Sequence, residues 1–279
     1  MKYPKAQRRT LDQLREHYEI EKELAQILRS ASKDERKRLY TVVYDQLYRR
    51  VPYHPQITVK GDLGDQTEHV LSQMRLLKRF LLPEVTFLEI GPGDCSLAFE
   101  VAKFVKKVYA VDISKEITEN QSRPKNVQLI ISDGCDIPVP LDSVNLAYSN
   151  QLIEHLHPDD AFEHLTNVHN ALSAGSAYIC VTPNRLNGPH DISKYFDEVA
   201  TGFHLKEYTI TELEQMFKKA GFLRVLKLVW VKRRFLLLPI IPFKLIERVL
   251  SSLPGSLCQR IAQCAPVHLL LSVKLLGIK

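Results

Sequence analysis

The stretch FLEIGPGDCS, residues 87–96, places an acid and two glycines where a buried apolar run ends. Gly91 and Gly93 let the backbone turn sharply and approach a ligand closely, because glycine has no Cβ atom and tolerates positive φ angles. A helix that follows such a turn presents free N–H groups and the positive end of its dipole. The pattern therefore predicts a ligand site at the turn.

Two acids indicate the chemical class of that ligand. Asp112 ends the next apolar run, where a carboxylate can accept both hydroxyl groups of a ribose. The dinucleotide fingerprint requires a third glycine, but that position is Ser96, and Glu89 would repel a pyrophosphate. Glu89 instead suits a nucleoside that carries a positive charge and an ammonium group. The alternative for Glu89 is an ordinary pair with a nearby Lys or Arg.

Short apolar runs alternating with helical segments must position these acids. The runs are nearly continuous, as is typical of strands covered on both faces, and they span residues 85–90, 107–112, 127–132, 144–149 and 176–182. Helical segments are expected between them at 96–105, 115–121 and 158–173. This β-α repeat predicts a parallel sheet with right-handed crossovers. A helix at 210–220 and strands at 222–232 and 268–279 complete the pattern.

Both ends of the chain add segments outside this repeat. Helical spacing predicts two helices within residues 6–51, a loop at 59–65 and a third helix at 66–81. We predict three parts: a helical lid over 1–65, a ligand-binding domain over 66–232 and 267–279, and an apolar, basic helical insert over 233–266.

The net charge of +6 is distributed unevenly along the 279 residues. Residues 1–60 and 222–279 are basic and residues 61–221 are acidic, which favours contact of the ends with an anionic surface. The alternative is that the basic residues lie on ordinary helix faces exposed to solvent.

No apolar run is long enough to span a bilayer, and no secretory signal is recognised. The five cysteines lack metal-type spacing. We therefore expect a cytoplasmic protein with reduced thiols that contacts an anionic membrane only peripherally, through its basic ends and the insert.

Four motifs together resemble the class I S-adenosylmethionine-dependent methyltransferases. They are FLEIGPGDCS, VYAVDIS, LIISDGCDIP and VNLAYSNQLIEHL, in that order across residues 85–181. Residues 208–228 resemble the next unit of the family. More narrowly, the chain resembles the ubiquinone-biosynthesis O-methyltransferase-like group of small-molecule enzymes (methyltransferase types 11 and 12). The resemblance implies a three-layer α/β/α Rossmann-like fold whose sheet has seven strands in the order 3-2-1-4-5-7-6, with the last strand antiparallel.

The resemblance also implies S-adenosyl-L-methionine as cofactor, S-adenosyl-L-homocysteine as product, and roles for ten residues. The methionine part would lie against Gly91 and Gly93 with its ammonium near Glu89, the ribose on Asp112, the adenine beside Ile113, Asp133, Gly134 and Cys135, and the sulfonium near Asn150 and Gln151. Two of these residues have structural alternatives: Asp133 as a turn residue and Asn150 as a helix N-cap.

Three histidines are candidates for handling a proton of the methyl acceptor. Methyl transfer from a sulfonium is an in-line displacement, so catalysis consists largely of orienting the acceptor and removing its proton. His155 follows the fourth strand, and His190 and His204 lie in the long segment 183–209 at the carboxyl edge of the sheet. The alternatives are a packed His155 and a His204 that braces the loop. In related enzymes an E-x-x-E-H element binds a divalent metal, but Gln151 replaces its first carboxylate, so no metal is expected.

We therefore expect O-methylation of a small molecule. The apolar run at 235–243 favours a lipophilic or lipid-linked acceptor. A nucleic-acid acceptor is not expected, because the acidic middle of the chain surrounds the site. The rival hypotheses are an NAD(P)-dependent oxidoreductase of Rossmann type and a non-catalytic cofactor-binding module. The identity of the acceptor, the atom methylated and the oligomeric state stay open.

Overall fold

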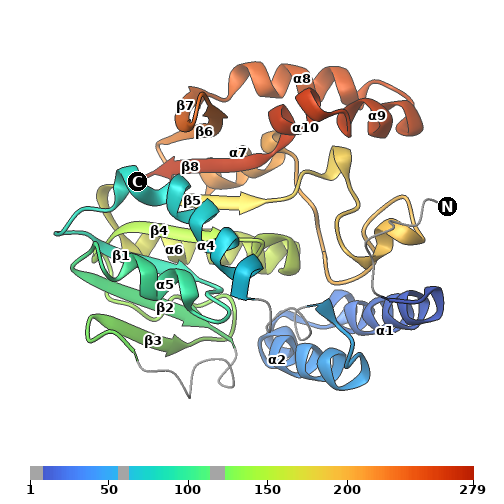
Figure 1. The fold of residues 1–279 in the computed structure, drawn as a ribbon, viewed down its shortest axis with the longest axis horizontal. Coiled ribbons are helices and arrows are strands. Elements are labelled where there is room, and N and C mark those ends of the chain that lie inside the picture. The colour runs from blue at the N-terminus through green and yellow to red at the C-terminus, as the bar shows by residue number, and fades with distance from the viewer. Residues whose placement is uncertain (1–8, 56–62, 114–122) are drawn as a thin grey trace.

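In the computed structural model, which describes residues 9–55, 63–113 and 123–279, a central sheet carries helices on both faces (Figure 1). Its strands run in the order β3-β2-β1-β4-β5-β8-β6-β7. Neighbours from β3 to β5 pair in parallel, whereas β8 pairs antiparallel with β5 and β6, and β7 antiparallel with β6. The strands are β1 (Thr86–Ile90), β2 (Lys107–Asp112), β3 (Val127–Ile131), β4 (Val144–Asn150), β5 (Leu172–Thr182), β6 (Arg224–Val231), β7 (Arg234–Pro239) and β8 (Val273–Ile278).

The predicted α/β/α fold is confirmed, but the predicted strand count of seven is wrong. The eighth strand is β7, which lies at the sheet edge in the first part of the predicted helical insert. Lys232 and Arg233 form a two-residue turn, so the apolar run after them folds directly back onto β6. Pairing with β6 gives the backbone groups of Arg234–Pro239 hydrogen-bond partners. Pro239 has no backbone N–H to donate and disfavours a helix over the same residues.

The helices agree with the predicted ones in kind and differ at their ends. They are α1 (Leu11–Ser30), α2 (Lys33–Arg50), α4 (Leu63–Leu77), α5 (Ser96–Val101), α6 (Pro158–Ala171), α7 (Ile210–Lys219), α8 (Ile241–Ser251), α9 (Gly255–Ala262) and α10 (Ala265–Leu271), with the 3₁₀ turns η2 (Lys78–Phe80), η3 (Ile153–His155), η4 (Arg185–Asn187) and η5 (Ile192–Tyr195). Residues 63–65, predicted as loop, begin α4, and residues 268–271, predicted as strand, end α10. The helix predicted at 115–121 and the loop at 59–62 lie outside the described residues. The limits of the three predicted parts stay predictions.

Alternation along the strands divides the core between the two faces of the sheet. Phe87 packs with α4 and α5 on one face, whereas its neighbour Leu88 packs with α6 and α7 on the other; both side chains are fully buried. The second face continues into α1 and α2, so the N-terminal helices share the core of the sheet.

The N-terminal helices are fixed by charged contacts to segments far away in the sequence. The guanidinium of Arg36 donates two hydrogen bonds, of 2.6 and 2.7 Å, to the buried carboxylate of Asp160 in α6, which also accepts from Tyr40. Arg29 donates to the carbonyl oxygens of Thr201 and Gly202. Figure 1 shows α1 and α2 together at one end of the sheet, next to the segment that follows β5. In the described parts of the chain, no helix combines the length and the apolar character needed to span a bilayer.

Candidate functional site

The turn after β1 has the geometry that its glycines predict. Gly91 and Gly93 adopt φ angles of +69° and +56°, which L-residues rarely adopt. A Cβ atom on Gly91 would lie 3.2 Å from Cδ1 of Leu152, so a larger residue would crowd the loop after β4. The backbone N–H of Gly93 donates to Oδ2 of Asp112 at 3.3 Å. This hydrogen bond joins the turn to the end of β2 at the carboxyl edge of the sheet, where open α/β folds form a ligand crevice.

Glu89 is a buried acid that lacks a cationic partner in the described structure. Its carboxylate accepts from the backbone N–H of Ala98, but Oε2 is buried without a hydrogen-bond partner. Burial raises the pKa of Glu89 to about 8, and the nearby carboxylates of Asp94 and Asp112 add to the shift. None of the ion pairs formed by residues 9–55, 63–113 and 123–279 includes Glu89, so the alternative of an ordinary pair with Lys or Arg is not seen there. A ligand cation placed here would meet an unsatisfied oxygen surrounded by negative charge.

Helix α2 covers the adenine side of the predicted cofactor site. The hydroxyl of Thr41 donates to the carbonyl oxygen of Ile113, and a Cβ atom on Gly134 would lie within 3.7 Å of both Ile113 and Tyr40. Tyr48 lies near Asp112: burial raises the pKa of Tyr48 to about 12, and the charge of Asp112 contributes.

Asp133 has the turn geometry that was its structural alternative. Its Oδ1 accepts from the backbone N–H groups of Cys135 and Asp136, and its Oδ2 lies 3.3 Å from Nζ of Lys37 in α2. Partial burial raises the pKa of Asp133, but these hydrogen bonds and Lys37 outweigh that effect and lower it. Its role toward adenine stays a prediction.

Asn150 and Gln151 lie at the end of β4, next to the turn after β1. Asn150 is the last residue of the strand and not a helix N-cap, because Leu152 precedes η3. Gln151 has a φ angle of +55°, is exposed, and donates its backbone N–H to the carbonyl oxygen of Val181. The strained backbone turns the chain from β4 into η3.

Two of the predicted histidines meet in one cluster. The rings of His155 and His204 pack edge to face with centroids 4.9 Å apart, and Glu154 lies beside both. Nδ1 of His155 lies 3.0 Å from the carbonyl oxygen of Phe203. Because a carbonyl only accepts, Nδ1 carries the proton and Nε2 keeps its lone pair. Nδ1 of His204 donates to the carboxylate of Glu207 at 2.7 Å.

Burial and the charges of neighbouring residues shift the pKa values of Glu154, His155 and His204. Burial, helped by His204, lowers the pKa of His155 to about 3, so its ring is neutral. Burial raises the pKa of Glu154 to about 7, although His204 opposes the shift. Burial lowers the pKa of His204, but its bond to Glu207 and the charge of Glu154 outweigh that effect and raise it. Of the three groups, Glu154 therefore has the pKa best suited to exchanging a proton near neutral pH.

His190 lies apart from this cluster and is held by the loop itself. Its Nε2 lies 3.1 Å from the carbonyl oxygen of Asn184 and 2.9 Å from Oδ1 of Asn187. Its backbone N–H donates to Glu207, the acid that also binds His204. The geometry gives His190 a bracing contact through Glu207, and a catalytic role stays a prediction.

The sequence interpretation missed the residues that enclose the cluster. Glu154 was noted only as part of a motif, yet it is fully buried and its Oε1 has no hydrogen-bond partner in the described structure. The ring of Tyr44 in α2 packs 4.8 Å from Phe203 and 6.2 Å from His155. Glu21 in α1 accepts from the backbone N–H of Phe203. Helical periodicity indicated only that these faces of α1 and α2 were buried.

The cluster also has the composition of a cation site. One donor atom from each of Glu154, His155 and His204 lies within 4.8 Å of the others. His204 is remote in sequence from the Q-x-x-E-H element, so spacing alone did not include it. A carboxylate and two imidazoles can bind a transition metal, although hard cations prefer more oxygen ligands.

Comparison with known proteins agrees with this geometry. Residues 88–180 match the family described as "Methyltransferase domain". Two probable S-adenosylmethionine-dependent methyltransferases from two strains of Mycobacterium tuberculosis are each 28% identical to the chain over 158 residues, 56% of this chain and 55% of each relative. The chain thus matches about half the length of these curated relatives.

Two solved structures share the fold at low sequence identity. A SAM-dependent methyltransferase from Archaeoglobus fulgidus has a TM-score of 0.50 and 17% identity, covering 76% of this chain and 94% of the other. A Haloferax volcanii complex of the Trm112 activator with a methyltransferase has a TM-score of 0.50 and 13% identity, covering 76% and 87%.

The chain contains a class I methyltransferase domain. The family predicted from the four motifs is confirmed at this level, and the narrower subgroup stays a prediction. Domains of this class take S-adenosylmethionine, which confirms the predicted cofactor at the same level. The structure fits it: Glu89 presents a buried carboxylate oxygen without a hydrogen-bond partner among the described residues, and Gly91 and Gly93 give the turn its positive φ angles.

Proposed function

We propose that this protein transfers a methyl group from S-adenosylmethionine to a hydroxyl oxygen of a small, lipophilic or lipid-linked acceptor. The observation that carries the proposal is Glu89, whose buried carboxylate has two further acids nearby and no cationic partner in the described structure. A binding site for an uncharged nucleoside or a diphosphate gains nothing from that arrangement. A ligand with an ammonium group and a sulfonium removes the repulsion among the three acids.

The crevice residues hold the cofactor in this proposal. Glu89 binds the ammonium, the backbone of Gly91 and Gly93 lies against the methionine part, and Asp112 binds the ribose hydroxyls. Ile113 and Gly134 contact the adenine beneath α2. When bound, S-adenosylmethionine supplies an electrophilic methyl group on a positively charged sulfur.

His155 accepts the proton of the acceptor hydroxyl. Its Nε2 lone pair is free because Nδ1–H is committed to Phe203. The low pKa of free His155 arises from burial and from the charge of His204, so a proton taken up at His155 passes readily to Glu154, whose pKa is about 7. Glu207 holds the ring of His204 in place.

The walls around the histidines favour an apolar acceptor. Tyr44 and Phe203 present ring surfaces next to His155, and α1 and α2 cover the segment that carries Phe203. These groups exclude water and orient an apolar body, which leaves the hydroxyl as the only polar group to be placed.

Titration calorimetry with S-adenosylmethionine and with NAD tests the cofactor, and transfer of a labelled methyl group to a panel from quinols to lipid-linked sugars tests the reaction. We expect binding of S-adenosylmethionine, no binding of NAD, and label in a hydroxyl-bearing apolar acceptor that is lost in Asp112→Ala. Binding of NAD alone would favour the oxidoreductase. Cofactor binding without transfer, in the panel or in cell extract, would favour the non-catalytic module.

The same assay separates a base from a metal at the Glu154, His155 and His204 cluster. We expect transfer to continue after treatment with a chelator, because Gln151 weakens the element that binds metal in related enzymes. Loss of transfer on chelation, restored by a divalent cation, would assign the cluster to metal binding instead.

A further inference from the structure

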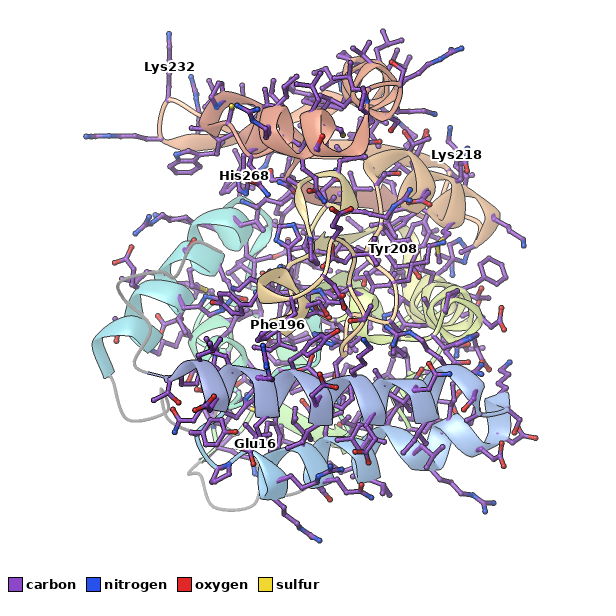
Figure 2. The ribbon with its side chains drawn as sticks, turned by 90° about the vertical axis from the view of Figure 1, so that its right-hand side faces the viewer. Glu16, Phe196, Tyr208, Lys218, Lys232 and His268 are labelled. Carbon is purple, nitrogen blue, oxygen red and sulfur yellow. The ribbon has the colours of Figure 1, made fainter. Side chains whose placement is uncertain are left out.

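A groove outside the candidate methyltransferase site combines five basic side chains with two aromatic rings. It lies between the end of α4 with η2 and the β6–β7 hairpin, and its volume is about 890 Å³. The basic residues are Arg75, Lys78, Arg79, Arg233 and Arg234, and Lys232 sits at the tip of the hairpin. Figure 2 shows Lys232 pointing away from the molecule at its upper end.

The charges of the groove are largely uncompensated. Among the described residues, Arg75 pairs with Glu68 at 3.1 Å, but no carboxylate pairs with Lys78, Arg233 or Arg234. Arg79 donates to the carbonyl oxygen of Phe235, which fixes η2 against the hairpin. Charged residues on an edge strand commonly prevent it from pairing with another chain. Here, however, only half of the basic residues belong to the hairpin, and the other half belong to α4 and η2. The arrangement is therefore a cationic site and not edge protection alone.

The tip of the hairpin keeps basic residues where their backbone is unfavourable. Lys232 and Arg233 have φ angles of +46° and +67°, positions that Asn and Gly fill with less strain in two-residue turns. Strained backbone positions often occur at functional sites. Here the strained residues are the two that form the turn of the β6–β7 hairpin.

The aromatic and aliphatic side chains near the basic groove indicate which kind of anionic partner fits it. Trp230 is 44% exposed and packs on Phe235 with ring centroids 4.8 Å apart. Helix α8, which follows β7 directly, exposes Ile241, Leu245 and Val249 by 69%, 58% and 63%. These residues are four apart, so they lie on one face of the helix. The hairpin and α8 both lie at the upper end of the molecule (Figures 1 and 2).

We propose that the groove and the outer face of α8 together dock on the surface of an anionic lipid bilayer, with lipid phosphates in the groove and the α8 side chains in the headgroup region. Basic residues are attracted to anionic lipids, Trp favours the membrane interface, and an aliphatic helix face gains by leaving water. A nucleic acid would use the cations and the rings but not the aliphatic stripe, which is why the bilayer is favoured.

The single tryptophan of the chain makes the test direct, because Trp230 is part of the groove. The full chain is mixed with vesicles of phosphatidylcholine alone, or with about one quarter phosphatidylglycerol, and both tryptophan emission and co-sedimentation are measured. We expect a blue shift and co-sedimentation only with the anionic vesicles, and weaker binding at high salt.

Two charge variants localise the effect. Lys78→Gln/Arg233→Gln/Arg234→Gln should weaken vesicle binding by about tenfold or more. The matched control Lys103→Gln/Lys106→Gln/Lys125→Gln removes the same charge from exposed residues near the opposite edge of the sheet and should bind as the parent does. A third variant, Ile241→Ser/Leu245→Ser/Val249→Ser, should bind less while keeping the electrostatic part. Because all nine residues are exposed, an unchanged melting temperature should accompany each variant.

Three results would overturn the proposal. They are no binding to anionic vesicles, equal losses in the groove and control variants, or the same emission shift with a short RNA that the groove variant abolishes. The experiment measures vesicle binding and not methyl transfer. A negative result would therefore overturn the docking proposal without bearing on the proposed function.

Discussion

Two buried carboxylates, Glu89 in the cofactor crevice and Glu154 in the histidine cluster, have similar burial and opposite surroundings. Each has one oxygen without a hydrogen-bond partner in the described structure. Asp94 and Asp112 add negative charge around Glu89, whose pKa is raised to about 8, whereas His204 offsets part of the shift at Glu154, whose pKa reaches about 7. A buried acid among acids is suited to receive a cation from outside, and a buried acid beside imidazoles is suited to exchange protons within the protein.

The largest effect that would test this contrast is expected at the histidine cluster. His155→Gln should lower the methyl-transfer rate by about 10²–10⁴-fold, because the proton acceptor is lost, while cofactor affinity stays unchanged. Single-turnover formation of S-adenosylhomocysteine with an accepted substrate measures the rate, and calorimetry measures the affinity.

His157→Gln is the matched control for that variant. His157 lies two residues further on and is half-buried, and its Nδ1 accepts from the backbone N–H of Asp159 and lies 3.6 Å from the carboxylate of the same residue. An equal loss in both variants would mean that local packing, and not proton transfer, explains the effect.

The next largest effect is expected at Glu89. Glu89→Gln should weaken S-adenosylmethionine binding at least tenfold, about 1.4 kcal/mol, because a neutral amide does not pair with the ammonium. Glu100→Gln in α5 removes a partly exposed acid that pairs with Lys103, and it should leave affinity unchanged. Unaltered affinity in Glu89→Gln would remove the ammonium contact from the proposal.

A smaller effect should appear as pH dependence. The ionised form of Glu89 binds the cation, and its pKa in the free protein is about 8, so affinity should rise about fivefold from pH 7 to pH 8 and about twofold more above pH 8. Binding at pH 7 should therefore release a proton, which calorimetry detects as a dependence of the enthalpy on the buffer. The dependence should vanish in Glu89→Gln; if it persists there, another group is responsible.

The smallest effect is expected at Lys37, which pairs with Asp133 from α2. Lys37→Met should change cofactor affinity by less than about fivefold, because half-exposed ion pairs contribute about 1 kcal/mol or less. A larger loss would show that Lys37 determines the position of Asp133 for adenine.

The crevice could be predicted from the sequence because its parts are local. Gly91 and Gly93 are read from the end of one apolar run and Asp112 from the end of the next, and parallel strands bring such ends to one edge of the sheet. The same local logic failed at Arg234–Pro239, where an apolar run with a closing proline was predicted to begin a helical insert. Only the pairing with β6 decided that it is a strand.

The sequence by itself determined the β-α order, the glycine turn, and the acids at the strand ends, because each depends on neighbours a few residues away. The tertiary structure decided that His204 meets Glu154 and His155, that Glu89 has no cationic partner among the described residues, and that α4 brings its basic residues to the β6–β7 hairpin. Burial, pKa and charge density depend on what lies across the fold, and residues far apart in the chain supply it.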